Sequence, residues 1–143
     1  MRKRILVVDD DPFDQALFRS AFQRIGSEAH IDIVPDVGVA VGYLQERPAP
    51  TLVVVDLKLR HESGLELIRW LRADPDCRWI PAVTLSGSDD PADVRASYEA
   101  GANAYLVKPQ TLEEIDDIVA RIDAFWLGAC ALADDPLARS AAG

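Results

Sequence analysis

Acidic, hydroxyl and ammonium side chains stand directly after four short apolar runs of this 143-residue chain. Asp9 and Asp10 follow the first run, Asp56 the third, Ser86 the fourth and Lys108 the fifth. If the first and third runs form neighbouring strands, their carboxylates converge, and two carboxylates about 4 Å apart repel by roughly 4 kcal/mol at an effective dielectric constant of 20. Three such groups raise one another's pKa values or require a cation. The sequence therefore predicts a cation site.

The residue types also indicate which cation and which reaction this site serves. An all-oxygen ligand set without histidine or cysteine is typical of Mg²⁺, which accepts phosphate oxygens beside its waters. Three carboxylates, one Mg²⁺ and Lys108 carry no net charge together. An acyl phosphate on Asp56 removes one carboxylate charge and adds about two negative charges, which a hydroxyl and an ammonium can hold. This pattern favours in-line phosphoryl transfer to a carboxylate nucleophile.

An alternation of strands and helices must bring these residues together. Short apolar runs predict strands at residues 5–8, 31–34, 52–55, 82–85 and 104–107. The run at 5–8 is continuous and β-branched, which is typical of a strand covered on both faces, whereas the run at 31–34 is weaker. Helical spacing follows each run, with start signals at Asp11-Pro12 and Thr111 and with Phe13 and Leu112 on the apolar faces. Five such repeats predict an α/β fold, a doubly wound five-stranded parallel sheet of the (βα)5 type. Such sheets bind ligands at the carboxyl ends of their strands.

Composition excludes several classes of protein. Lys and Arg number 15 and Asp and Glu number 24, so the net charge of −9 offers no basic stripe for nucleic acid. The longest uncharged apolar stretch, 125–133, is about half a membrane span, and the first apolar run ends at Asp9, too soon for a signal peptide. Cys77 and Cys130 form no metal or redox pair. We therefore predict a cytoplasmic protein with reduced cysteines and with neither a membrane nor a nucleic-acid partner.

The longer motifs around these residues resemble one family, the receiver domain of bacterial two-component response regulators, which has the CheY-like fold. The resemblance implies the flavodoxin-like strand order 2-1-3-4-5, a receiver domain over residues 1–128, and a C-terminal tail over residues 129–143 that extends a dimer contact. It covers about residues 3–128 and rests on Ile5–Pro12, Val53–Leu57, Gly64, Val83–Ser88, Ala100–Ala102 and Tyr105–Pro109.

The resemblance assigns the acidic residues to phosphorylation and metal binding. It implies that Asp56 is the phosphoacceptor and that Asp10 and Asp56 bind Mg²⁺ directly. Asp9 then acts on the metal largely through water, and the backbone carbonyl of Lys58 takes a further metal position. The Lys58 side chain places a second cation near the acceptor, and we expect it to alter the rate of dephosphorylation.

The same resemblance assigns the residues that respond to the phosphoryl group. Ser86 and Lys108 contact its oxygens, and a cis Lys108–Pro109 peptide bond, a minority state that a fold must hold, aims the lysine inward. Ser86 and Tyr105 form the switch, in which the serine moves toward the phosphoryl group and the tyrosine ring turns inward. The new charge thereby shifts a packing element between two arrangements.

A narrower resemblance concerns the partners. The segments 72–76, 79–81 and 125–127 are similar to single-domain regulators that work with bacterial phytochrome histidine kinases. This similarity implies a sensor histidine kinase as donor, a phytochrome in particular, and an output through protein contact or a downstream phosphotransfer protein. Such regulators often form homodimers, and the residues predicted for that interface are Trp126, Leu127, Cys130 and Leu132.

The function predicted is a phosphoacceptor signalling protein rather than an enzyme, and three alternatives compete with it. A phosphohydrolase with an aspartate nucleophile usually needs a second aspartate two residues later, where this chain has Lys58. A flavodoxin-type electron carrier needs a Ser/Thr/Gly-rich phosphate loop after its first strand, where residues 9–11 are all aspartate. A receiver-like interaction module that is never phosphorylated would not need the complete set of acids, hydroxyl and lysine.

Overall fold

The computed structural model describes residues 3–46 and 48–133, so residues 134–143 of the predicted tail lie outside the described part. Its central layer is a five-stranded parallel sheet in the order β2-β1-β3-β4-β5. This order confirms the predicted one. The strands are β1 (Arg4–Val8), β2 (His30–Val34), β3 (Leu52–Val55), β4 (Ala82–Ser86) and β5 (Ala104–Val107).

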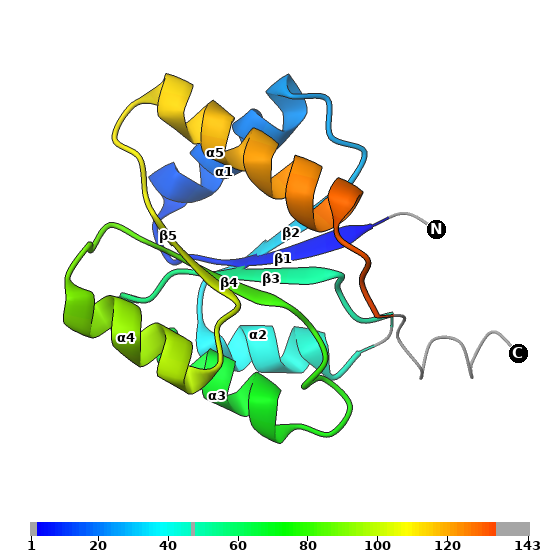
Figure 1. Ribbon diagram of the computed structural model, residues 1–143, viewed down its shortest axis with the longest axis vertical. Coiled ribbons are helices and arrows are strands. Elements are labelled where there is room, and N and C mark those ends of the chain that lie inside the picture. The colour runs from blue at the N-terminus through cyan, green and yellow to red at the C-terminus, as the bar shows by residue number, and fades with distance from the viewer. Residues whose placement is uncertain (1–2, 47, 134–143) are drawn as a thin grey trace, which may run out of the picture.

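Helices cover both faces of the sheet, as a doubly wound fold requires (Figure 1). One face carries α1 (Pro12–Arg24) and α5 (Leu112–Ala124), and the π-helical segment η1 (Phe125–Ala129) continues α5. The other face carries α2 (Val37–Leu44), α3 (Leu65–Ala73) and α4 (Pro91–Ala100). Within the described residues, no helix has the length and apolar character needed to cross a bilayer.

The central strands supply side chains to two hydrophobic cores. Ile5 and Val7 of β1 face α1 and α5, whereas Leu6 and Val8 face α2 and α3, and all four are buried. Burial on both faces explains why these strands read as continuous apolar runs. In the register of β1 with β3, Val8 pairs with Val55, so the residues that follow both strands leave the sheet at the same level.

The helix starts confirm part of the sequence interpretation and correct another part. The side chain of Asp11 caps α1 by accepting from the Phe13 N–H, and Thr111 caps α5 in the same way. Phe13 and Leu112, however, are 70% and 58% exposed, although their spacing placed them on apolar faces. Both residues lie in first turns at the carboxyl edge of the sheet, because each helix begins just after a strand ends.

Gly64 lets the start of α3 lie against the end of β3. Its N–H donates to the Leu57 carbonyl at 2.8 Å. A Cβ atom at Gly64 would lie 2.1 Å from the carbonyl oxygen of Asp56 and 2.9 Å from a methyl group of Val55. Any side chain here must therefore displace the backbone that carries Asp56.

We expect Gly64→Ala to lower the free energy of unfolding by roughly 1–3 kcal/mol, as overpacking does in other cores. Gly42→Ala is the matched control, because Gly42 lies in the last turn of α2 and an added Cβ meets no neighbouring atom within 4 Å outside the backbone of its own helix. That change should raise the unfolding free energy by up to about 1 kcal/mol through helix propensity. Urea unfolding measures both, and equal effects would contradict the close approach.

Candidate functional site

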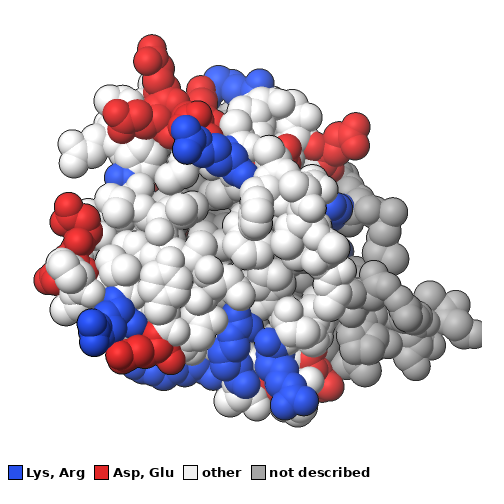
Figure 2. Space-filling view, in the orientation of Figure 1, with Lys and Arg blue, Asp and Glu red and all other residues white. Residues whose placement is uncertain are grey.

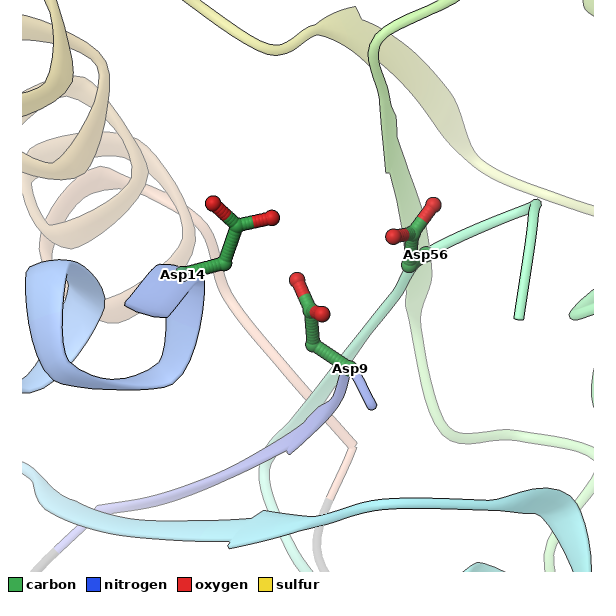
Figure 3. Close-up of side chains that lie close together, drawn as sticks. All are labelled: Asp9, Asp14 and Asp56. Carbon is green, nitrogen blue, oxygen red and sulfur yellow. The ribbon is translucent and has the colours of Figure 1, made fainter. Parts of the chain in front are cut away.

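Three carboxylates meet at the carboxyl edge of the sheet. Asp9 follows β1, Asp56 follows β3, and Asp14 lies in the first turn of α1. Figure 3 shows their side chains pointing toward one another, and one ligand oxygen of each lies within 4.8 Å of the others. Their side chains are 2%, 11% and 28% exposed, in the order Asp9, Asp56, Asp14. The group is therefore deep at Asp9 and opens to solvent at Asp14.

Lys108, which follows β5, supplies the positive charge of this group. Its Nζ donates at 2.8 Å to one oxygen each of Asp9, Asp14 and Asp56. An ammonium has three N–H donors, so the three bonds use all of them. Burial by itself lowers the pKa of Lys108, but the bonds to the three carboxylates outweigh burial and raise that pKa above its ordinary value. Lys108 is therefore a charged and fully bonded lysine.

Asp9 shows the opposite balance between burial and pairing. Burial raises the pKa of Asp9, although hydrogen bonds from Lys108 and from the Asp11 backbone N–H at 2.9 Å lower it in part. The charge of Asp56 raises the Asp9 pKa further. Three carboxylates around one ammonium carry an excess of two negative charges. Their oxygens fit a hard divalent cation in both donor type and charge.

The carboxylate of Asp10 is engaged outside this group. It accepts a hydrogen bond from the backbone N–H of Arg60 and thereby ties the segment after β1 to the segment after β3. Direct metal binding by Asp10 stays a prediction. The structure instead adds Asp14, which sequence reasoning missed. The available signal was its place in the first turn of α1, since that helix starts directly after the acids of β1.

Ser86 and Lys58 are two further residues that the sequence placed near the acceptor. Ser86 ends β4 and is 1% exposed, and its carbonyl accepts from the Lys108 backbone N–H at 2.7 Å. The Lys58 backbone N–H donates to Asp56 Oδ1 at 3.1 Å. The Lys58 side chain, in contrast, forms an exposed ion pair with Asp93 of α4 at 3.5 Å. The second cation is therefore directed toward α4 rather than toward the three carboxylates.

Hydrogen bonds connect Ser86 with Tyr105 through one residue. The Ser88 backbone N–H donates to the Ser86 hydroxyl at 3.3 Å, and the Tyr105 hydroxyl donates to the Ser88 carbonyl at 2.7 Å. The Ser88 hydroxyl also donates to Asp93 at 2.6 Å. The two predicted switch residues are therefore linked. The cis form of the bond before Pro109 stays a prediction.

The predicted dimer residues differ in their exposure. Trp126 is partly buried against the α1 and α5 core, and its ring meets the exposed Phe125 ring edge-on at a centroid distance of 5.1 Å. Cys130 and Leu132 are partly exposed. Leu127, however, is only 9% exposed and belongs to that core. Leu127 therefore offers little free surface, and its contact with a second copy stays a prediction.

A parallel sheet with acids after β1 and β3 and a lysine after β5 defines the class of phosphoacceptor receiver domains. The family described as the response regulator receiver domain matches residues 5–120 of the chain. The chain belongs to this family, which confirms the resemblance stated above.

Relatives of known structure are similar over almost the whole chain. Response regulator Rcp1 of Synechocystis sp. is 33% identical over 131 residues, which cover 87% of this chain and 89% of Rcp1. The Mn²⁺-bound form of Rcp1 matches with a TM-score of 0.82 at 32% identity, covering 92% of this chain and 99% of that one.

Two further structures are named for phytochrome signalling. The phosphorylated cyanobacterial phytochrome response regulator RcpA matches with a TM-score of 0.87 at 29% identity, over 94% of this chain and all of that one. The bacteriophytochrome response regulator RtBRR matches with a TM-score of 0.71 at 34% identity, over 99% and 89% of the two chains. The narrower similarity, to phytochrome response regulators, is thereby confirmed.

The buried charge of Asp9 makes a prediction about stability and pH. Burial raises the pKa of Asp9 in the folded state, so folding favours the protonated form of this carboxyl. The free energy of unfolding therefore decreases as the pH rises through the ordinary titration range of a carboxyl, because the buried group must then carry a charge. Asp9→Asn should therefore raise the melting temperature at pH 7 in chelator-treated buffer. A gain of about 2–4 °C corresponds to roughly 1 kcal/mol for a chain of this size. The gain should shrink toward pH 4.

The control for this measurement is Asp89→Asn, which removes an exposed carboxylate before α4. It should shift the melting temperature little at either pH. An Asp9→Asn variant that melts below the wild type at pH 7 would show that pairing with Lys108, rather than burial, dominates the energetics of Asp9.

Proposed function

We propose that this chain is a phosphoacceptor signalling protein in which Asp56 receives a phosphoryl group from a histidine kinase with the help of Mg²⁺. The observation that carries this proposal is the contact of Lys108 Nζ with Asp56 and Asp9, which come from the ends of two strands. A nucleophilic carboxylate, a fixed ammonium and an excess of negative charge are the parts that metal-assisted phosphoryl transfer to aspartate needs.

In the proposed step, a carboxylate oxygen of Asp56 attacks the phosphorus atom. The bond between phosphorus and the imidazole nitrogen of the donor breaks, and its electron pair stays on the imidazole. The Lys108 N–H that donates to Asp56 before the reaction then donates to a phosphoryl oxygen. The buried Ser86 hydroxyl, on the neighbouring strand, is the second donor. Mg²⁺, when bound, supplies positive charge to the phosphoryl oxygens.

The position of Lys58 argues against turnover of external substrates. An aspartate phosphohydrolase uses a proton donor two residues after its nucleophile, and here that side chain is a lysine paired with Asp93. We therefore propose a protein that is phosphorylated and loses the phosphoryl group on its own site, and that acts on no other substrate. Because the protein would receive its phosphoryl group from a kinase domain inside the cell, the proposed location is the cytoplasm.

Ser88 connects the proposed switch residues to the surface that a partner would contact. When the Ser86 hydroxyl turns to the phosphoryl group, the Ser88 N–H loses its acceptor at 3.3 Å. Ser88 also holds the Tyr105 hydroxyl through its carbonyl and Asp93 through its hydroxyl. A rearrangement here therefore reaches β5 and the start of α4, where a partner can detect it.

The proposed donor is a phytochrome histidine kinase. Its support is the similarity over almost the whole chain to RcpA and RtBRR, which are named as phytochrome and bacteriophytochrome response regulators. The proposed output is a contact with another protein, a downstream phosphotransfer protein included.

Homodimerisation is proposed through the groove between β5 and α5. This groove has a volume of about 650 Å³ and is apolar at its base, with Leu106, Ile118 and Trp126 among its lining residues. Arg121 and Asp117 lie at the same groove and form an ion pair with each other at 3.1 Å, so a two-fold copy meets a polar rim beside the apolar lining. The adjoining Phe125 ring is 54% exposed.

Phe125→Glu should weaken this dimer at least tenfold, because each copy would then place a negative charge against the apolar groove of the other copy. Phe13→Glu is the control, since Phe13 is 70% exposed at the opposite edge of the molecule's α1–α5 layer. Sedimentation equilibrium of the wild type and both variants, with and without a phosphoryl analogue, measures the dissociation constant. A wild type that stays monomeric at micromolar concentration under both conditions would remove the dimer.

Acetyl phosphate with Mg²⁺ should add one phosphoryl group to the wild type, as mobility on a phosphate-binding gel reports. Asp56→Asn should accept none, because the amide is no nucleophile, whereas Asp89→Asn, an exposed control, should match the wild type. A label retained by Asp56→Asn would overturn the assignment of the acceptor. Transfer from several purified histidine kinases tests the donor separately. A phytochrome kinase that is no faster than the others would reject only the phytochrome partner.

A further inference from the structure

Asp14 is the one member of the three-carboxylate group to which the reaction described above gives no role. Its carboxylate lies 2.8 Å from Lys108 Nζ, closing the set of three acceptors around that ammonium. The backbone around it is fixed from two sides. Asp11 caps α1, and the Gln15 side-chain amide donates to the carbonyl of Asp9. The ion pair between Asp14 and Lys108 therefore joins the start of α1 to the end of β5.

Phosphorylation changes which oxygens accept hydrogen bonds from Lys108, but the charge of Asp14 stays the same. Before the reaction, the three donors of the ammonium serve three carboxylates, each at 2.8 Å. Afterwards the Asp56 carboxylate is part of an acyl phosphate and has lost its own charge, and the phosphoryl group carries about two negative charges. Asp14 then competes with the phosphoryl oxygens for the same ammonium. Its fixed charge also lies at the solvent-facing side of the site, from which an anionic donor must approach.

We propose that Asp14 is a positioning residue that sets the charge of the phosphorylation site. It holds Lys108, strengthens the binding of a divalent cation, and opposes the gain of negative charge when Asp56 is phosphorylated. This inference rests on the proposed function, because it concerns the same reaction. It assigns two effects of opposite sign to one carboxylate, and loss of folding could not produce that combination.

The size of both effects follows from Coulomb's law. A unit charge about 4 Å from another changes an affinity by roughly fivefold in bulk water, and by more at a lower effective dielectric constant. Asp14 is 28% exposed, so the value for water is a lower bound. We expect Asp14→Asn to weaken Mg²⁺ binding about fivefold or more. At saturating Mg²⁺, we expect it to accelerate phosphorylation by acetyl phosphate by a similar factor.

Asp11→Asn is the matched control, because it removes a carboxylate three residues away on the same turn. Asn caps helices as well as Asp does, so α1 keeps its start. Asp11 is exposed, and its carboxylate serves the Phe13 N–H. Its loss should change both quantities by less than twofold. Asp14→Asn preserves size and an acceptor oxygen, and its melting temperature verifies that the variant is folded.

Calorimetric titration with Mg²⁺ and phosphorylation by acetyl phosphate are measured on the full chain for the wild type and both variants. A weaker Mg²⁺ affinity together with faster phosphorylation, in Asp14→Asn alone, supports the inference. The inference is overturned if Asp14→Asn has the same Mg²⁺ affinity and phosphorylation rate as Asp11→Asn. It is also overturned if both the affinity and the rate decrease in Asp14→Asn. A wild type that acetyl phosphate does not label would instead refute the proposed function, and the Mg²⁺ titrations alone then decide the role of Asp14.

Discussion

One buried ammonium group, that of Lys108, holds together the three carboxylates at the carboxyl edge of the sheet. Lys108 Nζ meets three carboxylates at 2.8 Å each, although burial opposes the charge of Lys108 and that of Asp9. Strands β3 and β4 separate β5 from β1, so the long stem of a lysine is needed to bring the charge from β5 to Asp9. The register of β1 with β3 then decides that Asp9 and Asp56 are level.

The excess negative charge around this ammonium links structure to signalling. In the proposed reaction, the carboxylate oxygens hold a divalent cation while the Lys108 ammonium and the Ser86 hydroxyl hold the phosphoryl oxygens, so each bound group alters the energetics of the other. The effect extends outward because Ser86 is bonded to Ser88, which in turn holds Tyr105 and Asp93. Figure 2 shows a face of the molecule that is largely uncharged at its centre, with acidic side chains mainly at the upper and left margins and basic side chains mainly along the lower margin.

The sequence predicted the strands better than the surroundings of the site. The run at 52–55 matches β3 in full, because a parallel strand buried on both faces is continuously apolar. The run at 104–107 matches β5 in full as well, although this edge strand is only partly buried. Helical periodicity identified an apolar face of α1 but not where the sheet beneath it ends, so Phe13 has the spacing of that face and is nevertheless 70% exposed. The role of Asp14 and the burial of Leu127 escaped prediction for a related reason. Both depend on how whole helices dock on the sheet, which spacing along the chain does not encode.

The location of a bound cation tests this account most directly. Manganese can replace magnesium at an oxygen site and scatters anomalously, so a crystal soaked in MnCl₂ reveals the ion by its anomalous difference density. The account predicts one peak at the carboxyl edge of the sheet, coordinated by carboxylate oxygens that come from the ends of both β1 and β3. A fully soaked crystal with no peak there, or with a peak bound by acids of one strand end alone, would contradict it.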